Sequence, residues 1–354
     1  MSASHFTIVV WVCAMVATFF ARRLIIQWGW FDHPNARSSH VAPTPRGGGV
    51  AIVLVTLGGT GFLMLSAGLG GRLSPVVGVT VLFGGAAIAL LGLVDDRRGL
   101  TASWRLRLQA LTTACALTAI GGLAPVPVGE GIVDYGWLGH VLAWPALIWF
   151  VNLYNFMDGI DGIAASEAVF VSLSAAWLTA CTGAPPALTW TWLLVGSASL
   201  GFLPFNWAPA RLFMGDVGSG FLGYVIAVLL VVSGHLSGLS LWTAIILTGP
   251  FFADATVTLA RRVARQERWN VAHRSHAYQR LARRLGSHAK VTALLMAMNV
   301  GVILPVAWYS VRCPAWAGLM TAVVILMMAS AAWLLGAGTP ESSADDRNQR
   351  KDST

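Results

Sequence analysis

Residues 211–236 read RLFMGDVGSGFLGYVIAVLLVVSGHL, and this stretch decides the fold class. Its first part carries one acid, Asp216, among glycines, and its second part is a long apolar run. About 20 apolar residues cross the hydrocarbon core of a bilayer as a helix. A soluble protein would carry roughly a quarter charged residues, but here 11% are charged and 56% are hydrophobic. The sequence therefore predicts an all-α integral membrane protein.

Similar apolar blocks recur along the whole chain and predict a polytopic bundle of about eleven transmembrane helices. The predicted spans are 6–26, 50–70, 75–94, 104–122, 138–153, 163–182, 188–205, 219–236, 240–260, 291–311 and 315–336. The first block lacks a basic segment before it and a small-residue cleavage site, so we interpret it as a retained helix. Between the spans, residues 123–137 could hold a small turn or hairpin. We expect a single transmembrane domain over 1–336 and a disordered, charge-mixed tail over 337–354.

Lysine and arginine predict the orientation of the bundle, because cytoplasmic loops carry an excess of both. On an alternating path of eleven spans, one set of loops and the tail hold almost all of them, and the opposite set holds only Arg72 and Arg312. The N-terminus is therefore predicted to be periplasmic and the C-terminus cytoplasmic. This topology also explains the net charge of +8, so nucleic acid is not an expected partner. The four cysteines have neither metal-binding spacing nor a disulfide framework.

The unusual polar residues gather in the five loops predicted to be cytoplasmic, which are 27–49, 95–103, 154–162, 206–218 and 261–290. A transporter would place coupling charges near the bilayer midplane, so this distribution favours a site at the cytoplasmic membrane surface. The exception is Asp254, which lies inside an apolar block. An intramembrane acid is a candidate functional residue, but Asp254 could equally pair with Arg261 and Arg262.

Two of these loops are rich in carboxylates. Asp95 and Asp96 end an apolar block, and adjacent residues on a helix point in different directions, so one could face a metal or phosphate while the other takes a proton. Asn155, Asp158 and Asp161 stand three residues apart and share one side of a helical turn. Carboxylate and amide oxygens are the ligands that Mg²⁺ prefers.

Two further loops suggest phosphate and base recognition. Backbone N–H groups at the start of the helix after Gly215 could cradle phosphate oxygens, with Asp216 holding a bridging cation and Phe213 offering a ring for a base. In the basic loop, His273, Arg274 and His276 suit a pyrophosphate. Each segment also has a plain structural explanation, such as a charged end of a span, a helix cap or a lipid-facing basic loop.

If the spans bundle, these loops form one site with acids, cations and phosphate-binding groups beside the lipid. Acids gathered around cationic residues suit Mg²⁺ and a phosphorylated substrate, and a position at the lipid interface suits an acceptor that is itself a lipid. The reaction class that follows is phosphoryl transfer from a soluble diphosphate to a membrane-bound acceptor.

The ordered set of motifs resembles the polyprenyl-phosphate N-acetylhexosamine-1-phosphate transferases. The resemblance runs from about Asp32 to His276. It rests on PTPRGGG at 43–49, Asp95-Asp96, NLYNFMDGIDG at 152–162, FMGDVGS at 213–219 and the loop His273-Arg274-Ser275-His276. It implies transfer of a sugar 1-phosphate from a UDP-N-acetylhexosamine to undecaprenyl phosphate, with release of UMP, in the inner membrane of a bacterium. The cofactor implied is Mg²⁺, with Mn²⁺ as the alternative ion, and a homodimer is compatible with the resemblance.

The resemblance also implies roles for individual residues. Asn155 and Asp216 match metal-binding positions, and Asp95, Asp96, Asp158 and Asp161 complete the catalytic acids. The predicted substrate-binding residues are Arg46, Arg105, Asn152, Phe213, His273, Arg274 and His276. Asp95 acts as a base or orients the lipid phosphate, which is already largely dianionic at pH 7 because its second pKa is about 6. Both direct attack and a covalent aspartyl intermediate remain open.

The basic loop lacks the consecutive histidines expected of the phospho-N-acetylmuramoyl-pentapeptide transferases. Its string His-Arg-Ser-His-Ala-Tyr-Gln looks most like enzymes that start O-antigen on UDP-N-acetylated deoxyhexosamines such as FucNAc or QuiNAc. The alternatives are the muramoyl-pentapeptide branch, a transporter or flippase of a lipid-linked sugar, and a non-catalytic membrane scaffold.

Overall fold

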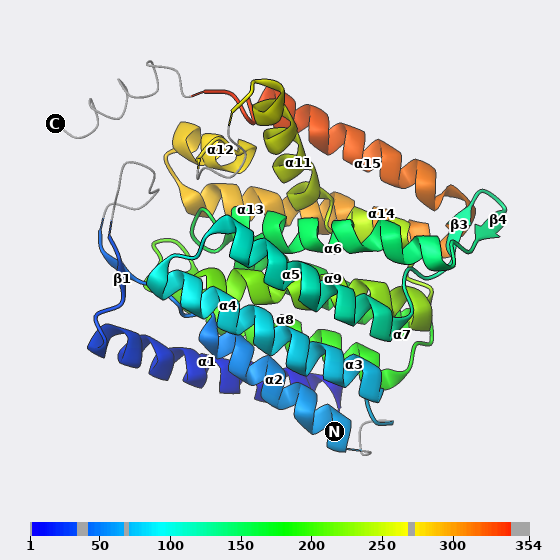
Figure 1. The fold of residues 1–354 in the computed structure, drawn as a ribbon, viewed down its shortest axis with the longest axis horizontal. Coiled ribbons are helices and arrows are strands. Elements are labelled where there is room, and N and C mark those ends of the chain that lie inside the picture. Colours follow the sequence, from blue (N-terminus) through cyan, green and yellow to red (C-terminus); the bar gives the residue numbers. More distant parts are fainter. Residues whose placement is uncertain (1, 34–41, 67–70, 268–272, 341–354) are drawn as a thin grey trace.

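The computed structural model describes residues 2–33, 42–66, 71–267 and 273–340. Within them the chain is almost entirely helical, and its helices lie side by side in one bundle (Figure 1). In chain order these are α1 (Ala3–Gln27), α2 (Val50–Leu65), α3 (Pro75–Val79), the π-helix η1 (Thr80–Gly84), α4 (Gly85–Arg98), α5 (Ala102–Ile120), α6 (Trp137–Phe156), α7 (Ile163–Cys181), α8 (Pro186–Asn206), α9 (Asp216–Ser237), α10 (Leu241–Leu247), α11 (Gly249–Ala264), α12 (Ala277–Leu285), α13 (His288–Met298), the π-helix η2 (Asn299–Ile303), α14 (Leu304–Arg312) and α15 (Pro314–Leu334).

Each predicted apolar block overlaps one helix or one run of consecutive helices. In the described chain, eight of these are long and apolar enough to cross a membrane, and the pair α10–α11, bent by 79°, adds a ninth. Two predicted spans fall short of that standard. Helix α2 has 16 residues, about 24 Å at 1.5 Å per residue, and α5 carries Arg105 and Arg107 in its first turns. The count of eleven therefore stays a prediction, as does the orientation.

Two small hairpins complete the fold. Strands β3 (Val126–Val128) and β4 (Gly131–Val133) pair antiparallel, which confirms the hairpin expected in 123–137. Strands β1 (Phe31–Asp32) and β2 (Thr44–Pro45) pair at the opposite end of the bundle, where α12 also lies (Figure 1). The first four residues of the predicted tail, 337–340, pack against α11 and α12. Residues 341–354 lie outside the described ranges.

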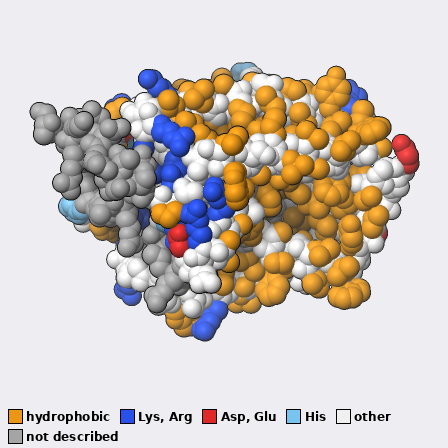
Figure 2. All heavy atoms as spheres, turned by 90° about the horizontal axis from the view of Figure 1, so that it is seen from above, with side chains coloured by type: hydrophobic (Ala, Val, Ile, Leu, Met, Phe, Trp, Pro, Cys, Tyr) orange, Lys and Arg blue, Asp and Glu red, His pale blue; other side chains and the backbone are white. Residues whose placement is uncertain are grey.

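Helix α9 forms the centre of the bundle. Of its apolar membrane-spanning stretch 89% is buried inside the protein, whereas the corresponding fraction is 28% for α1 and for α15. Helices α4 and α6 pack on either side of it. Figure 2 shows the outer surface that results: hydrophobic side chains cover most of the visible face, and lysine and arginine gather at one end. This arrangement places the start of α9 and the ends of α4 and α6 at the basic end of the molecule.

Candidate active site

Three helices meet closely where the predicted motifs lie. A Cβ added to Gly49, at the start of α2, would lie 2.3 Å from the Gly218 Cα in the first turn of α9. A Cβ added to Gly92 of α4 would lie 2.3 Å from the Asp216 carbonyl oxygen. Any side chain at these glycines would push the backbones apart. The glycines therefore let α2 and α4 reach the first turn of α9.

The loop before α2 pairs with the loop before α9. The Phe213 N–H donates to the Pro45 carbonyl at 2.8 Å, and the Gly48 N–H donates to the Phe213 carbonyl at 2.9 Å. Arg46 and Phe213 form a parallel bridge. Two motifs about 170 residues apart in the sequence thus make one unit, and Arg46 is brought beside Asp216.

Three carboxylates and two guanidinium groups form what we call the acid–arginine cluster: Asp95, Asp96, Asp216, Arg46 and Arg105. Arg46 contacts Asp96 at 2.8 Å and Asp216 at 3.1 Å. Arg105 contacts Asp95 at 2.7 Å and lies 3.9 Å from Asp216. Each arginine thus bridges two acids, and Asp216 is the acid that both arginines reach. Charge-assisted contacts of this kind hold the acids close together despite their repulsion.

Asp96 caps the start of α9. Its two carboxylate oxygens accept the N–H groups of Asp216 at 3.0 Å and Val217 at 3.1 Å. A carboxylate at this position is favoured by the helix dipole. A side chain from α4 thus occupies two of the N–H groups expected to cradle a phosphate, and the phosphate site itself stays a prediction.

Asp216 is held differently. Within the described residues its carboxylate meets side chains only: both arginines, the Asp95 carboxyl, and the Asn155 amide nitrogen at 3.0 Å, which also contacts Ser219 Oγ at 2.8 Å. A cavity of about 30 Å³ opens here, enough for a water or a small cation. It is lined by Ile88, Leu91, Gly92, Asp95, Arg105, Gln109, Asn152, Asn155, Phe156, Asp216 and Gly220.

The donor set fits a hard cation with few protein ligands. In the described parts of the chain, no group of three or more His, Cys, Asp or Glu side chains surrounds a common metal position. Mg²⁺ does not require such a group, because it keeps several waters and binds through one or two carboxylates together with substrate phosphates. Asp216 supplies carboxylate oxygens beside the cavity, and Asn155, whose amide nitrogen faces Asp216, would offer its amide oxygen after rotation of the side chain. The arginine contacts of Asp216 can be exchanged for a cation.

The two acids of the segment 158–162 have separate environments. Asp161 accepts the Ala210 N–H at 3.1 Å and faces His288 Nδ1 at 3.4 Å, so it ties its loop to α8 and α13. The Asp158 N–H donates to the Asn155 carbonyl at 3.2 Å, but its carboxylate makes no hydrogen bond or ion pair to any described residue. Burial raises the pKa of Asp158, and the neighbouring Asp216 carboxylate acts in the same direction. The structure thus brings Asp158 toward the acid–arginine cluster, whereas Asp161 supports the framework.

Residues 273–276, which we call the His loop, carry two stacked imidazoles with ring centres 5.0 Å apart. The Ser275 N–H and hydroxyl lie 3.5 and 3.1 Å from His273 Nδ1. Because a backbone N–H can only donate, Nδ1 accepts and Nε2 carries the proton. Burial, with His276 and Arg262 nearby, lowers the pKa of His273 to about 3. His273 is therefore neutral at pH 7 and presents one N–H donor.

Asp254 anchors the His loop. Its carboxylate accepts the N–H groups of Ala277 at 2.9 Å and Tyr278 at 3.0 Å, and the Thr258 hydroxyl at 3.0 Å. It also faces His276 Nδ1 at 3.4 Å. One buried acid of α11 therefore caps α12 and orients the imidazole that immediately precedes it.

The alternative pairing of Asp254 with the arginines at the end of α11 is not found. Arg262 pairs with Glu267 at 3.4 Å, and Arg261 donates to the Trp333 and Ala337 carbonyls. Asp254 is instead bonded to the backbone N–H groups at the start of α12.

The His loop lies against the acid–arginine cluster through α6. The Tyr278 hydroxyl donates to the Phe156 carbonyl at 2.9 Å, and the Phe156 and His276 rings are 6.5 Å apart. Phe156 also lines the small cavity. The segments predicted to converge therefore do so at one end of the bundle.

Known proteins similar in sequence to this chain belong to one family. Residues 79–234 match the family described as glycosyl transferase family 4. A probable undecaprenyl-phosphate N-acetylglucosaminyl 1-phosphate transferase of Bacillus subtilis is 30% identical over 272 residues, covering 75% of this chain and 74% of that protein. The chain belongs to this family.

Other members of the family are also similar. A decaprenyl-phosphate N-acetylglucosaminephosphotransferase of Mycobacterium tuberculosis is 34% identical over 234 residues, which cover 60% of this chain and 57% of the relative. A phospho-N-acetylmuramoyl-pentapeptide-transferase of Moorella thermoacetica is 36% identical over 159 residues, covering 41% and 50%. The matched family segment includes the acid–arginine cluster apart from Arg46, and ends before the His loop.

The remaining predicted family residues have the following positions. Asn152 donates to Gln109 Oε1 at 2.7 Å and lines the cavity. The Phe213 backbone makes the pairing with the loop before α2, and its ring is half-buried. The Arg274 carbonyl accepts from Arg283 at 3.1 Å. Their assignment to substrate binding stays a prediction.

Sequence reasoning missed several residues that shape the site. Gln109 and Ser219 contact the predicted asparagines, and His288 holds Asp161. Glu167, 1% exposed, accepts from the Asn299 amide at 2.6 Å inside the bundle. Glu167 could have been found as a second acid within an apolar block, but the other three gain importance only through their partners.

Proposed function

We propose that this protein transfers an N-acetylhexosamine 1-phosphate from a UDP-sugar to undecaprenyl phosphate, releasing UMP and starting lipid-linked surface polysaccharide of the O-antigen type. The observation that supports this most directly is Asp216, which lies between two arginines at a cavity linked to the His loop through Phe156. Anionic and cationic groups around a small cavity suit a diphosphate and its counter-ion. The similar B. subtilis protein is named as a probable undecaprenyl-phosphate N-acetylglucosaminyl 1-phosphate transferase.

The proposed reaction is an in-line displacement. An oxygen of the lipid phosphate forms a bond to the β-phosphorus of the UDP-sugar, and the bond from that phosphorus to the α–β bridging oxygen breaks, so UMP leaves with that oxygen. Arg105 would hold the lipid phosphate, since it lies in the first turn of α5, lines the cavity and is 35% exposed. Asp95 holds Arg105 at 2.7 Å and accepts the Leu100 N–H, which makes it a group that orients the attack.

Other residues of the cluster would bind and align the donor. Arg46 lies beside Asp216 and can neutralise charge on the diphosphate. Asp216 and Asn155 would hold Mg²⁺, or Mn²⁺ in its place, which when bound neutralises charge that develops on the transferring phosphoryl group. In the His loop, His273 presents a neutral N–H donor, and His276 is oriented by Asp254. This loop would meet the diphosphate and the sugar.

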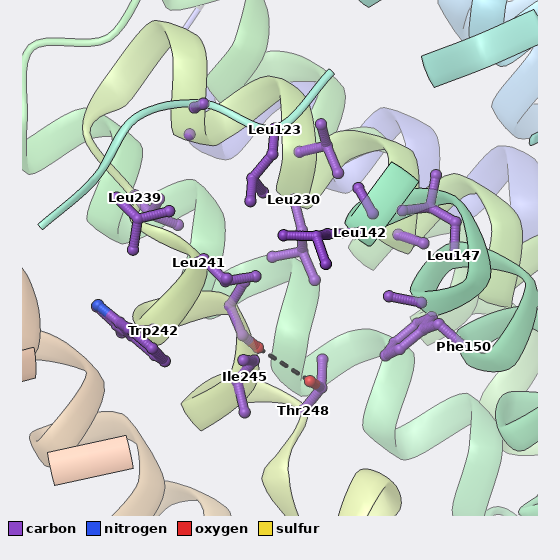
Figure 3. A pocket seen from close by; sticks show the side chains of 18 of the residues that line it. Leu123, Leu142, Leu147, Phe150, Leu230, Leu239, Leu241, Trp242, Ile245 and Thr248 are labelled. Carbon is purple, nitrogen blue, oxygen red and sulfur yellow. Dashed lines mark hydrogen bonds between the residues drawn. The ribbon is translucent and has the colours of Figure 1, made fainter. Parts of the chain in front are cut away.

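An apolar cavity deeper in the bundle suits the prenyl chain of the acceptor (Figure 3). It has a volume of about 310 Å³ and lies between α6, α9 and the bent pair α10–α11. Leu142, Leu147, Phe150, Leu230 and Ile245 are among its lining residues, and the Thr248 hydroxyl bonds to the Ala244 carbonyl. The wall is mainly apolar, and the Thr248 hydroxyl and the Trp242 indole N–H already bond to backbone carbonyls, so it offers a polyprenyl chain chiefly apolar contact.

We place this site on the cytoplasmic side of a bacterial inner membrane. Nucleotide sugars are available there, and the basic end of the molecule in Figure 2 agrees with the excess of Lys and Arg in cytoplasmic loops. For the sugar we favour an N-acetylated deoxyhexosamine such as FucNAc or QuiNAc, on the resemblance of the His loop.

A transporter is less well supported. It would require polar residues along a path through the midplane. The two acids buried among the described spans are instead bonded locally, Asp254 to the start of α12 and Glu167 to Asn299.

The test uses purified wild-type protein with Mg²⁺, undecaprenyl phosphate and a panel of UDP-GlcNAc, UDP-GalNAc, UDP-QuiNAc and UDP-FucNAc. We expect UMP and a lipid-linked sugar diphosphate with at least one donor, and no UMP when the lipid or the metal is omitted. Absence of UMP with every donor would rule out the proposal. Radiolabelled sugar phosphate trapped on the protein without lipid would replace direct attack by a covalent intermediate.

A further inference from the structure

The chain does not leave the bundle when α15 ends. Residues 336–340, which we call the C-terminal strap, turn back across α11 and α12. Gly336 and Gly338 have φ angles of +86° and +69°, in the left-handed region that favours glycine. Ala337, between them, is fully buried. The sequence indicates a flexible tail here, so this ordered return needs an explanation.

Two arginines hold the strap from its two sides. Arg261 of α11 donates to the Ala337 carbonyl at 2.9 Å and to the Trp333 carbonyl at 3.2 Å, and its guanidinium lies 3.8 Å from the centre of the Trp333 ring. Arg280 of α12 donates to the Thr339 carbonyl and, at 3.0 Å, to the Pro340 carbonyl. Hydrogen bonds from charged donors are roughly twice as strong as neutral ones.

The strap bonds directly to the His loop. The Gly338 N–H donates to the Ser275 carbonyl at 2.8 Å. The fit is close, because a Cβ at Gly338 would lie 2.6 Å from the Thr258 carbonyl oxygen and 2.9 Å from Arg261 Cβ. Ser275 in turn places its hydroxyl 3.1 Å from His273 Nδ1 and precedes His276 in the chain.

The His loop is thus held on two sides. Asp254 binds the backbone that follows His276, and the strap binds the carbonyl that precedes it. A simple helix end would need only the bond from the Ala337 N–H to the Ala332 carbonyl, at 3.0 Å. The bonds to Ser275 and Arg280 go beyond what capping α15 requires.

We propose that the C-terminal strap is a positioning element for the His loop, acting through the bond from Gly338 to Ser275. This inference rests on the proposed function, in which the His loop meets the diphosphate and sugar of the donor. The strap touches no reacting atom. It sets the position of the His273 N–H and of the His276 ring, and therefore the affinity for the UDP-sugar.

The first experiment compares two truncations of the protein. Removal of 341–354 leaves the strap and serves as the control, whereas removal of 336–354 deletes it. We expect the longer truncation to raise KM for the UDP-sugar about five- to tenfold, the size expected for loss of one or two positioning hydrogen bonds. KM for undecaprenyl phosphate should stay within about twofold of the control. Equal rises in both KM values would overturn the proposal.

The second experiment uses point variants of the full chain and stays decisive if the longer truncation fails to fold. Gly338→Ala introduces the clash with Thr258, and Gly286→Ala is a matched control. Gly286 also has a left-handed φ, +59°, but nothing lies within 4 Å of an added Cβ. We expect only Gly338→Ala to raise KM for the UDP-sugar, with the thermal unfolding temperatures of the two variants alike.

Amide hydrogen exchange over residues 273–279 tests the positioning role of the strap independently of the proposed transferase function. Gly338→Ala should accelerate exchange in this segment relative to Gly286→Ala, whether or not a donor has been found. Unchanged exchange and unchanged KM in Gly338→Ala would refute the strap. Faster exchange in a protein whose wild type releases no UMP would retain the strap as an anchor of the loop and reject its link to the donor.

Discussion

Asp216 and Asp254 are both acids at the basic end of the bundle, but their surroundings differ. Among the described residues the Asp216 carboxylate meets side chains only: Arg46 at 3.1 Å, Asn155 at 3.0 Å, Arg105 at 3.9 Å and the Asp95 carboxyl. The Asp254 carboxylate accepts two backbone N–H groups and a hydroxyl, all within 3.0 Å. Side-chain partners can move to admit a cation or phosphate, whereas a capped helix start cannot be released without losing the cap. The first arrangement suits binding and the second suits support.

The supporting acids follow one plan. Asp96 of α4 caps α9, whose first residue is Asp216, and Asp254 of α11 caps α12, which begins directly after His276. In both cases an acid from one helix fixes the start of another helix that carries a candidate binding group. An acid that stands out in the sequence can thus act one step away from the candidate binding group, through the helix start that it caps.

The largest effect is expected from Asp216→Asn. The change removes the negative charge that the cluster and a bound cation share, so transferase activity should fall at least about 1,000-fold. The measurement is UMP release at saturating Mg²⁺. Asp134→Asn, an exposed acid at the hairpin end, is the control and should keep wild-type activity. Retention of more than a tenth of the activity in Asp216→Asn would show that this acid is not a binding group.

A smaller loss is expected from Arg46→Lys. The guanidinium contacts Asp96 and Asp216 through two different nitrogens. The lysine ammonium has a single nitrogen and cannot reproduce both contacts in the same geometry. Activity should fall about 10- to 100-fold. Arg72→Lys, at an exposed position outside the cluster, is the matched change. Equal activity of the two variants would mean that only the charge of Arg46 matters.

Asp254→Asn should lower transferase activity about tenfold, because it changes the position of His276 and not a direct contact with the substrate. The decisive measurement is a double-mutant cycle with His276→Ala. If Asp254 acts through His276, the double variant should be about as active as His276→Ala alone. If the activity loss of the double variant equals the product of the losses in the two single variants, Asp254 has a role independent of His276. That result would contradict the distinction between supporting and binding acids.

The smallest effect is expected from Glu167→Gln. Glu167 Oε1 and Asn299 Oδ1 are both buried and have no hydrogen-bond partner among the described residues, so a glutamine amide keeps the present bond and can add a second. Activity should change less than about twofold, whereas Glu167→Ala should lower the free energy of unfolding by about 1 kcal/mol. Glu130→Gln, an exposed change, is the control. A large loss of activity in Glu167→Gln would extend the chemistry beyond the basic end.

Much of the site could be anticipated from local pattern. Asp95 and Asp96 stand out because charges end an apolar block, and Asn155, Asp158 and Asp161 because of their spacing. Their separate duties could not be anticipated. Asp96 acquires its partners from a helix start 120 residues away, and Asp161 acquires His288 from a helix that follows by 127 residues. The residues next to each acid in the sequence give no indication of either partner.

The sequence by itself determined the helical membrane class, because apolar runs of about 20 residues have no other stable form in a bilayer. It also determined which residue types carry the chemistry, because most charged groups lie at the ends of the spans or in the loops between them. Only the tertiary structure decided that Asp216 is reached by both arginines, that Asp96 and Asp254 cap helices, and that residues 336–340 return to the His loop. The physical reason is that a carboxylate takes its role from the donors around it, and those donors come from segments that only folding brings together.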